Sequence, residues 1–158
     1  MKRDHFELEV SNVAWMERDD PPEQPRVRID FHGVSDMLTD RVRTTDGELL
    51  SAAETDVAFR LQEPLEETGD ARGVVSVTNR FTGDFILELN ATADDVLRFI
   101  GAAREYDRQS DTDDGSYRID ISIDGTQLLS HEKSVFLVYG DDGQLLRSES
   151  LIPSGVEL

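Results

Sequence analysis

The strongest constraint on the fold is the stretch 73–106, in which two short β-type runs lead directly into a helical pattern. The runs 74–79 and 84–89 are joined by four residues that end in Gly83, which is a signal for a β-hairpin. Four apolar residues then recur with helical spacing: Val96, Phe99, Ile100 and Ala103. Thr92 is suited to cap the start of that helix. The stretch therefore predicts a hairpin followed by one main helix over about residues 93–106, packed on a sheet face.

Strand patterns fill most of the remaining chain. Alternation of apolar and polar residues predicts half-buried strands at 5–10, 26–31, 56–62 and 116–124, and the first two are close enough in sequence to pair. The pattern at 116–124 directs Tyr117 and three isoleucines toward the core, and it directs Arg118, Asp120 and Ser122 toward solvent. The nearly continuous apolar run 134–139 is typical of a central strand. Shorter strands are expected at 41–44, 48–50, 126–130 and 144–150.

These patterns give about ten short strands and one helix, without the strand–helix alternation of a parallel doubly wound sheet. The predicted fold class is therefore α+β, with one or more β-rich antiparallel sheets. We expect residues 1–158 to form a single domain, with a possible internal linker at 63–72. Trp15 follows a phase shift at 11–12 and could be an exposed contact for a partner, although a core position at a strand end is the favoured interpretation.

The charge of the chain limits its partners. It has 34 acidic and 16 basic residues, a net charge of −18, and its only lysines are Lys2 and Lys133. Two interpretations remain open: adaptation to molar salt, where the Debye length is about 3 Å, and an acidic surface for a basic partner. The first is favoured. Both argue against direct binding to nucleic-acid phosphates and against an anionic membrane surface.

No apolar run approaches the about 18 residues of a membrane helix. The first residues carry no apolar signal segment, so a cytoplasmic location is expected.

Candidate chemistry is sparse. The acidic clusters at 94–95, 111–114 and 141–142 lack the alternating ligands of a calcium loop, because counting back from Gly115 places only one carboxylate at a ligand position. His131, Glu132 and Ser134 are neighbours in sequence, but on a strand His131 shares its side with Lys133. The chain has no cysteine and no common nucleophile, zinc or phosphate-loop motif. We therefore predict no catalytic, cofactor-binding or metal-binding residues.

Four segments resemble a family of small conserved haloarchaeal proteins of unknown function. They are GVVSVTNRFTGDFILELN at 73–90, the helix that follows, RDHFELEV at 3–10 and LIPSGVEL at 151–158. The resemblance extends over the full length. It implies a cytoplasmic, high-salt setting, but no active site, cofactor or partner.

Two functional hypotheses follow. The first is a non-catalytic interaction or regulatory module that contacts an unknown protein partner through a sheet edge or an exposed apolar patch, with a homo-oligomer as an open alternative for its assembly. The alternative is a small-molecule-binding protein or enzyme with a pocket between helix and sheet. A deep pocket with convergent polar groups favours the alternative.

Overall fold

A computed structural model describes residues 5–33, 36–65, 70–109 and 115–152. Its helical elements are α1 (Trp15–Arg18), α2 (Asp36–Arg41), the short 3-10 helix η2 (Ala52–Glu54) and α3 (Ala93–Gln109). Its strands are β1 (Phe6–Ser11), β2 (Arg26–Phe31), β3 (Thr55–Leu61), β4 (Arg72–Asn79), β5 (Phe85–Thr92), β6 (Tyr117–Ile123), β7 (Thr126–Lys133) and β8 (Leu137–Tyr139). The fold is α+β as predicted, with eight described strands rather than about ten.

The strands form two four-stranded sheets. The first has the order β1-β2-β6-β7 and the second the order β5-β4-β3-β8. The predicted pairing of β1 with β2 and the β4–β5 hairpin are both confirmed as antiparallel. The expectation of purely antiparallel sheets is wrong, because β2 pairs with β6 and β3 pairs with β8 in parallel. Both parallel pairs join strands that are distant in sequence, whereas hairpin signals report only sequence neighbours.

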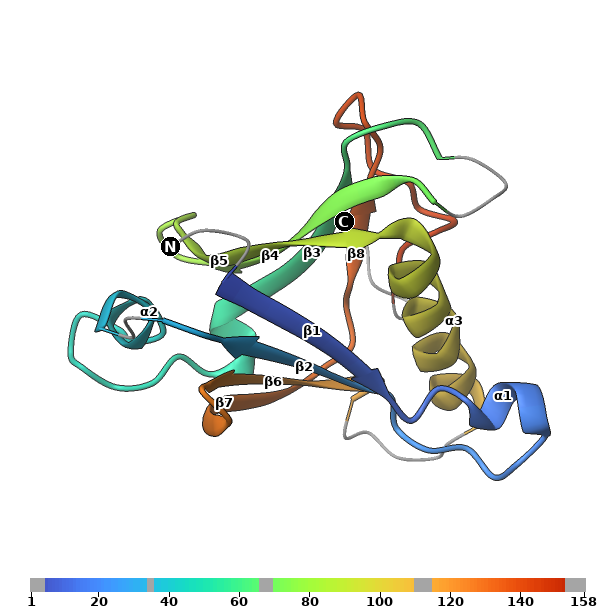
Figure 1. The fold of residues 1–158 in the computed structure, drawn as a ribbon, viewed down its shortest axis with the longest axis horizontal. Coiled ribbons are helices and arrows are strands. Elements are labelled where there is room, and N and C mark those ends of the chain that lie inside the picture. Colours follow the sequence, from blue (N-terminus) through green and yellow to red (C-terminus); the bar gives the residue numbers. More distant parts are fainter. Residues whose placement is uncertain (1–4, 34–35, 66–69, 110–114, 153–158) are drawn as a thin grey trace.

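The main helix is confirmed and continues three residues beyond the predicted end, to Gln109. It stands at one end of the two sheets and spans the distance between them (Figure 1). Phe99 is only 2% exposed, and its ring packs edge-on against Tyr117 of the first sheet and Phe136 beside the second. The helix therefore closes the core between two sheets instead of lying on the face of one.

Three local predictions need correction. Trp15 is buried as favoured, but it lies on α1, because Asn12 adopts a positive φ that ends the strand and its carbonyl oxygen accepts a hydrogen bond from the indole (2.6 Å). The run 134–139 yields the edge strand β8, not a central one. Its apolar residues are covered by residues 144–151, which form turns and isolated bridges instead of the predicted strand.

One further prediction is met in part. Residues 41–44 and 48–50 meet through one isolated bridge, between Arg43 and Leu49, and form no regular strands. The possible linker 63–72 overlaps the first residue of β4. Positions 66–69 lie outside the described residues.

One continuous cluster of buried apolar side chains joins both sheets and α3.

The faces of β6 also differ from expectation. Tyr117, Ile119 and Ile121 are buried as predicted, whereas Ile123 at the end of the strand is only half-buried. Asp120 and Ser122, predicted to face solvent, are buried as well. β6 is an inner strand, and polar side chains of its neighbours β2 and β7 close over this outward side. Alternation gave the correct phase, but it could not report what covers the second face.

Candidate interaction surface

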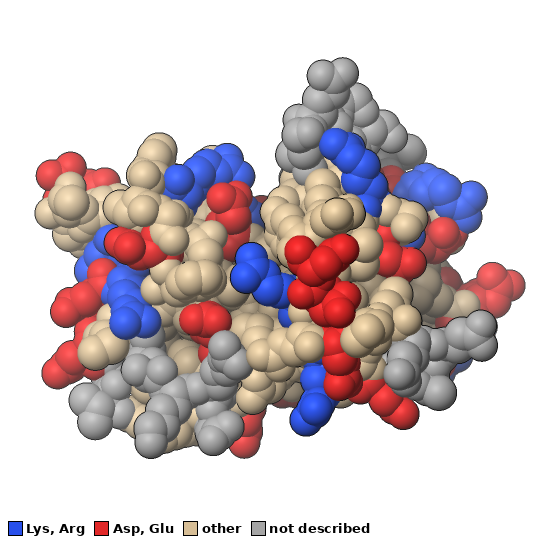
Figure 2. Space-filling model, turned by 90° about the horizontal axis from the view of Figure 1, so that it is seen from above, with Lys and Arg blue, Asp and Glu red and all other residues tan. Residues whose placement is uncertain are grey.

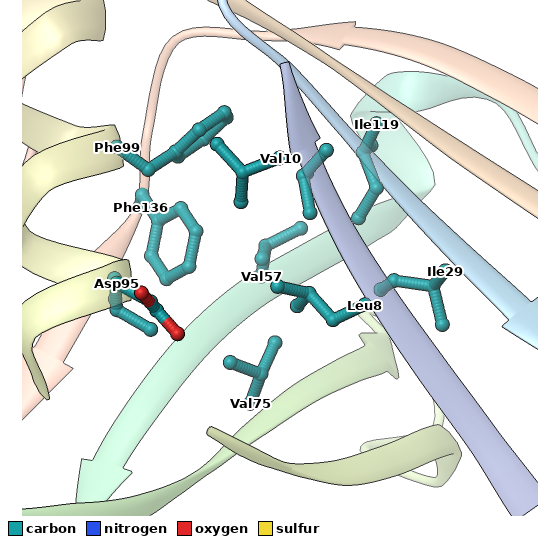
Figure 3. Close-up of a pocket in the computed structure, with 11 residues that line it drawn as sticks. Leu8, Val10, Ile29, Val57, Val75, Asp95, Phe99, Ile119 and Phe136 are labelled. Carbon is teal, nitrogen blue, oxygen red and sulfur yellow. The ribbon is translucent and has the colours of Figure 1, made fainter. Parts of the chain in front are cut away.

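The space between α3 and the sheets is packed core. It offers about 10 Å³ to a small molecule. Ten of its eleven lining side chains are apolar, and the eleventh is Asp95 at the helix side (Figure 3). The site envisaged for a ligand between helix and sheet therefore has neither the room nor the convergent polar groups of a binding pocket.

A different surface stands out by its exposed apolar side chains. Phe81 is 75% exposed, Phe85 50% and Leu49 45%, which is unusual for such large groups in a chain with low apolar content. All three line one surface hollow of about 580 Å³. Its walls come from residues 40–50, from Glu54 and from residues 79–86, and we call it the hairpin hollow. It lies at the end of the molecule opposite α3, where α2 contacts β5 (Figure 1).

The β4–β5 turn directs Phe81 into solvent. The Asn79 side-chain oxygen accepts hydrogen bonds from the backbone N–H groups of Phe81 (2.9 Å) and Thr82 (3.3 Å). Gly83 closes the turn with a positive φ of 75°, and its N–H donates to the Asn79 carbonyl oxygen (2.8 Å). These bonds fix the backbone around Phe81, so its ring is exposed on an ordered turn.

A β-bulge accounts for the exposure of Phe85. Leu87 pairs with Val77, but the next pair is Phe85 with Thr78, so Ile86 is the extra residue. Strict alternation would place Phe85 on the inner side with Leu87. The bulge instead buries Ile86 and turns Phe85 to the outer side.

The opposite wall of the hairpin hollow is a tight loop. The Thr44 N–H donates to the Glu48 carbonyl oxygen (2.7 Å), and the Arg43 guanidinium donates to the Gly47 carbonyl oxygen (2.8 Å). Leu50 is buried beneath this loop, while the adjacent Leu49 faces the hollow. Both walls are thus held by hydrogen bonds within the chain.

His131 and Lys133 support the segment behind the hollow. They share the inward side of β7, as predicted. The His131 Nε2 contacts the Leu50 carbonyl oxygen (2.9 Å), and Lys133 Nζ donates to the carbonyl oxygens of Ala52 (2.6 Å) and Thr55 (2.5 Å). Burial lowers the pKa of both side chains. Because its amine is bound to two carbonyl oxygens, Lys133, together with His131, holds residues 50–55 in place. That the chain has no catalytic residues stays a prediction.

The rim of the hairpin hollow is acidic. Five carboxylates and two arginines line it. Both arginines are engaged, Arg43 by Gly47 and Arg41 by the Met37 sulfur (3.3 Å). Four exposed carboxylates form no ion pair with any other described residue: Asp40, Asp46, Glu48 and Asp84. Elsewhere too, acidic side chains are spread over the surface rather than gathered at one place, as the face in Figure 2 shows.

A second, polar hollow of about 340 Å³ lies on the outer face of the first sheet. At its base Asp120 is 5% exposed. Its carboxylate pairs with the Arg26 Nε (2.6 Å) and accepts a hydrogen bond from the Ser130 hydroxyl (2.5 Å). No aromatic or large aliphatic side chain lines this hollow. Its central carboxylate is already ion-paired with Arg26 of β2 and hydrogen-bonded to Ser130 of β7.

Within the described ranges, no group of three or more His, Cys, Asp or Glu side chains is placed to hold a metal ion. Asp94 and Asp95 occupy the first turn of α3, and Asp142 accepts a hydrogen bond from the Gln144 N–H (3.1 Å). The cluster 111–114 lies outside the described residues. None of the described helices has the length and apolar character needed to cross a membrane.

Comparison with known proteins places the chain by family alone. No curated protein matches it, and no solved structure matches it. One family model, described as "Family of unknown function (DUF5793)", matches residues 1–158. This confirms the resemblance to an uncharacterised family that the sequence motifs indicated. Over its whole length, the chain belongs to this family of unknown function.

Proposed function

We propose that this chain is a non-catalytic interaction module that binds a protein partner through the hairpin hollow. The observation that carries the proposal is the gathering of Phe81, Phe85 and Leu49 around one hollow, all large, apolar and about half exposed or more. Contiguous exposed apolar groups rimmed by polar residues are typical of protein interaction sites.

The energetics favour a protein partner over a small ligand. Removing a large apolar side chain fully from water is worth about 1.5–3 kcal/mol, so covering these three partly exposed groups offers several kcal/mol. The ring of Phe81 projects outward from its turn. A protein surface can cover such a projecting ring more completely than a small molecule can. The walls are ordered by their own hydrogen bonds, which reduces the entropy lost on binding.

The proposed setting is a cytoplasm with molar salt. A net charge of −18 spread over one domain produces self-repulsion, which salt at about 1 M screens to distances of about 3 Å. Apolar contacts are retained in such a solvent, whereas exposed ion pairs weaken. An apolar hollow is therefore a suitable primary contact for a partner in that environment.

A second candidate function is the binding of a small polar molecule in the hollow above Asp120. The Asp120 carboxylate favours it, because it is buried at the base of a surface hollow and paired there with the exposed Arg26, and a few convergent polar groups in a hollow are typical of ligand sites. It ranks second because the carboxylate is already satisfied by Arg26 and Ser130. Protection against thermal unfolding by free amino acids or sugars, lost on Arg26→Gln, would favour this function.

Site-specific photocrosslinking tests the first proposal. A benzoylphenylalanine is introduced in place of Phe81, and as a matched control in place of Leu65, which is also exposed but lies outside the hairpin hollow. Both proteins are irradiated in native-host extract at molar KCl. We expect a discrete crosslinked product from position 81 and none from position 65. Equal products from both positions, or none from either, would refute the proposal.

A further inference from the structure

We infer that the partner segment bound by the hairpin hollow is basic and carries large apolar side chains. This inference rests on the proposed function and adds the chemistry of the partner. It follows from two features that occur at the same place. One is the exposed apolar set of Phe81, Phe85 and Leu49. The other is the ring of carboxylates around it.

The carboxylates of the rim are available to a partner. Asp40, Asp46, Glu48 and Asp84 are all exposed, and none is paired with another residue that the structure describes. The local arginines compensate them only in part, since five carboxylates line the hollow against two arginines. Neither arginine is ion-paired with a rim carboxylate among the described residues, because Arg43 donates to the Gly47 carbonyl and Arg41 to a sulfur atom. Lys or Arg side chains of a partner would supply the missing counter-charges. At molar salt this attraction acts only between charges in direct contact, so it selects the partner at the interface rather than attracting it from a distance.

The same charges argue against a second copy of the chain as the occupant. A copy would bring the same acidic rim and a further net charge of −18 to the contact. In a symmetric pair the same patch faces itself. Like charges would then be apposed across the interface, which is unfavourable. Self-association through this surface is therefore an outcome that would count against the inference.

The hollow of about 580 Å³ is as large as clefts of about 300–1,000 Å³ that enclose small ligands, so it has room for a few large side chains. It can accept large side chains from the partner between the hairpin wall and the 43–50 loop. Protein interfaces usually have aromatic and aliphatic side chains at their centre and polar or charged side chains at their rim. The expected partner segment therefore has Phe, Leu or similar residues separated by Lys or Arg.

The test uses a short synthetic peptide in which Lys and Arg alternate with Phe and Leu, labelled for fluorescence anisotropy. A control peptide replaces every Lys and Arg by Ser. Three variants of the full chain are compared with the wild type. The first is Phe81→Ser/Phe85→Ser. The second neutralises the rim: Asp40→Asn, Asp46→Asn, Glu48→Gln and Asp84→Asn. The third neutralises four exposed carboxylates elsewhere: Asp20→Asn, Asp94→Asn, Asp107→Asn and Asp141→Asn.

All proteins are measured at the lowest KCl concentration at which circular dichroism gives the native spectrum. We expect the rim variant to weaken binding of the basic peptide about tenfold, equivalent to about 1.4 kcal/mol, and the remote variant to weaken it less than about twofold. The phenylalanine variant should weaken it at least as much as the rim variant. The Ser control peptide should bind worse than the basic peptide to the wild type.

The outcomes separate the two levels of the proposal. Equal losses for the rim and remote variants would show a general effect of net charge and would overturn the basic-partner inference. So would failure of the peptide to bind, or sedimentation data showing dimers that dissociate on Phe81→Ser. In each case the Phe81 photocrosslink still decides whether the hairpin hollow binds a protein. A peptide that binds all variants alike would be non-specific and would also overturn the inference.

Discussion

Replacing Phe99 by Ala tests the architecture at the point where all layers meet. Its ring lies 5.4 Å from that of Tyr117 and 6.2 Å from that of Phe136, so one side chain joins α3 to both sheets. A buried Phe→Ala change costs about 3–5 kcal/mol. We expect the upper half of that range, because two aromatic contacts, each worth about 0.5–1.5 kcal/mol, are lost at once.

The matched control is Phe81→Ala, the same change at a ring that is 75% exposed. Surface substitutions of this kind usually alter stability by less than about 0.5 kcal/mol. Urea denaturation at constant KCl measures both. The whole domain should be stable by about 5–15 kcal/mol, so Phe99→Ala is expected to lower the midpoint strongly or to prevent folding. A cost below about 1 kcal/mol, or equal costs for the two variants, would refute the assignment of core and surface.

Three further predictions concern pH, the buried carboxylate and salt. Burial lowers the pKa of His131, so its contribution to stability is present above about pH 6.5 and is lost as the pH falls through the folded-state pKa. Hydrogen bonds to Glu7 and Asp124 raise the pKa of His32, so its contribution is present below about pH 6.5 and is lost as the pH rises. Urea titrations of His131→Gln and His32→Gln over this range should therefore remove slopes of opposite sign, and slopes of the same sign would be contrary evidence. Asp120→Ala should lower the free energy of unfolding by about 1–3 kcal/mol, because it leaves Arg26 and Ser130 without their acceptor. If urea denaturation shows no loss of stability, the Asp120–Arg26 ion pair has no structural role. Between about 0.01 M and about 1 M KCl the Debye length falls from about 30 Å to about 3 Å, and the melting temperature by circular dichroism should rise steeply; a flat profile would contradict salt adaptation.

The sequence predicted those elements whose signals are local. The β4–β5 hairpin and α3 were recognisable because turn residues, a cap and an apolar stripe all lie within the stretch 73–106. The parallel pairs were not recognisable, because β6 joins β2 across more than half the chain and no local pattern records that neighbour. The burial of Asp120 follows from the same long-range contact. The edge position of β8 was not predictable either, because the apolar run 134–139 looks the same in the sequence whether strands or turns cover it.

The sequence did not locate the candidate surface, and its role as an interaction surface stays a prediction. An exposed apolar patch was one of the expected outcomes, yet its residues were not identified. Phe81 carried a usable signal, since a large apolar residue in the middle of a hairpin turn has no core to enter. Phe85 carried none, because its exposure depends on the bulge at Ile86, which only the pairing with β4 defines. Leu49 and Leu50 are adjacent, and only the tertiary structure decides which of them is buried.

Hydrogen exchange on the purified chain, alone and in the complex recovered through the Phe81 crosslink, tests the central claim most directly. The account predicts slower exchange in the complex at residues 43–50 and 79–86, the two walls of the hairpin hollow. Exchange on the outer face of the first sheet and along α3 should be unchanged. Slower exchange confined to α3 or to the polar face around Asp120, or the failure to recover any complex at molar KCl, would contradict the claim that this surface binds a protein partner.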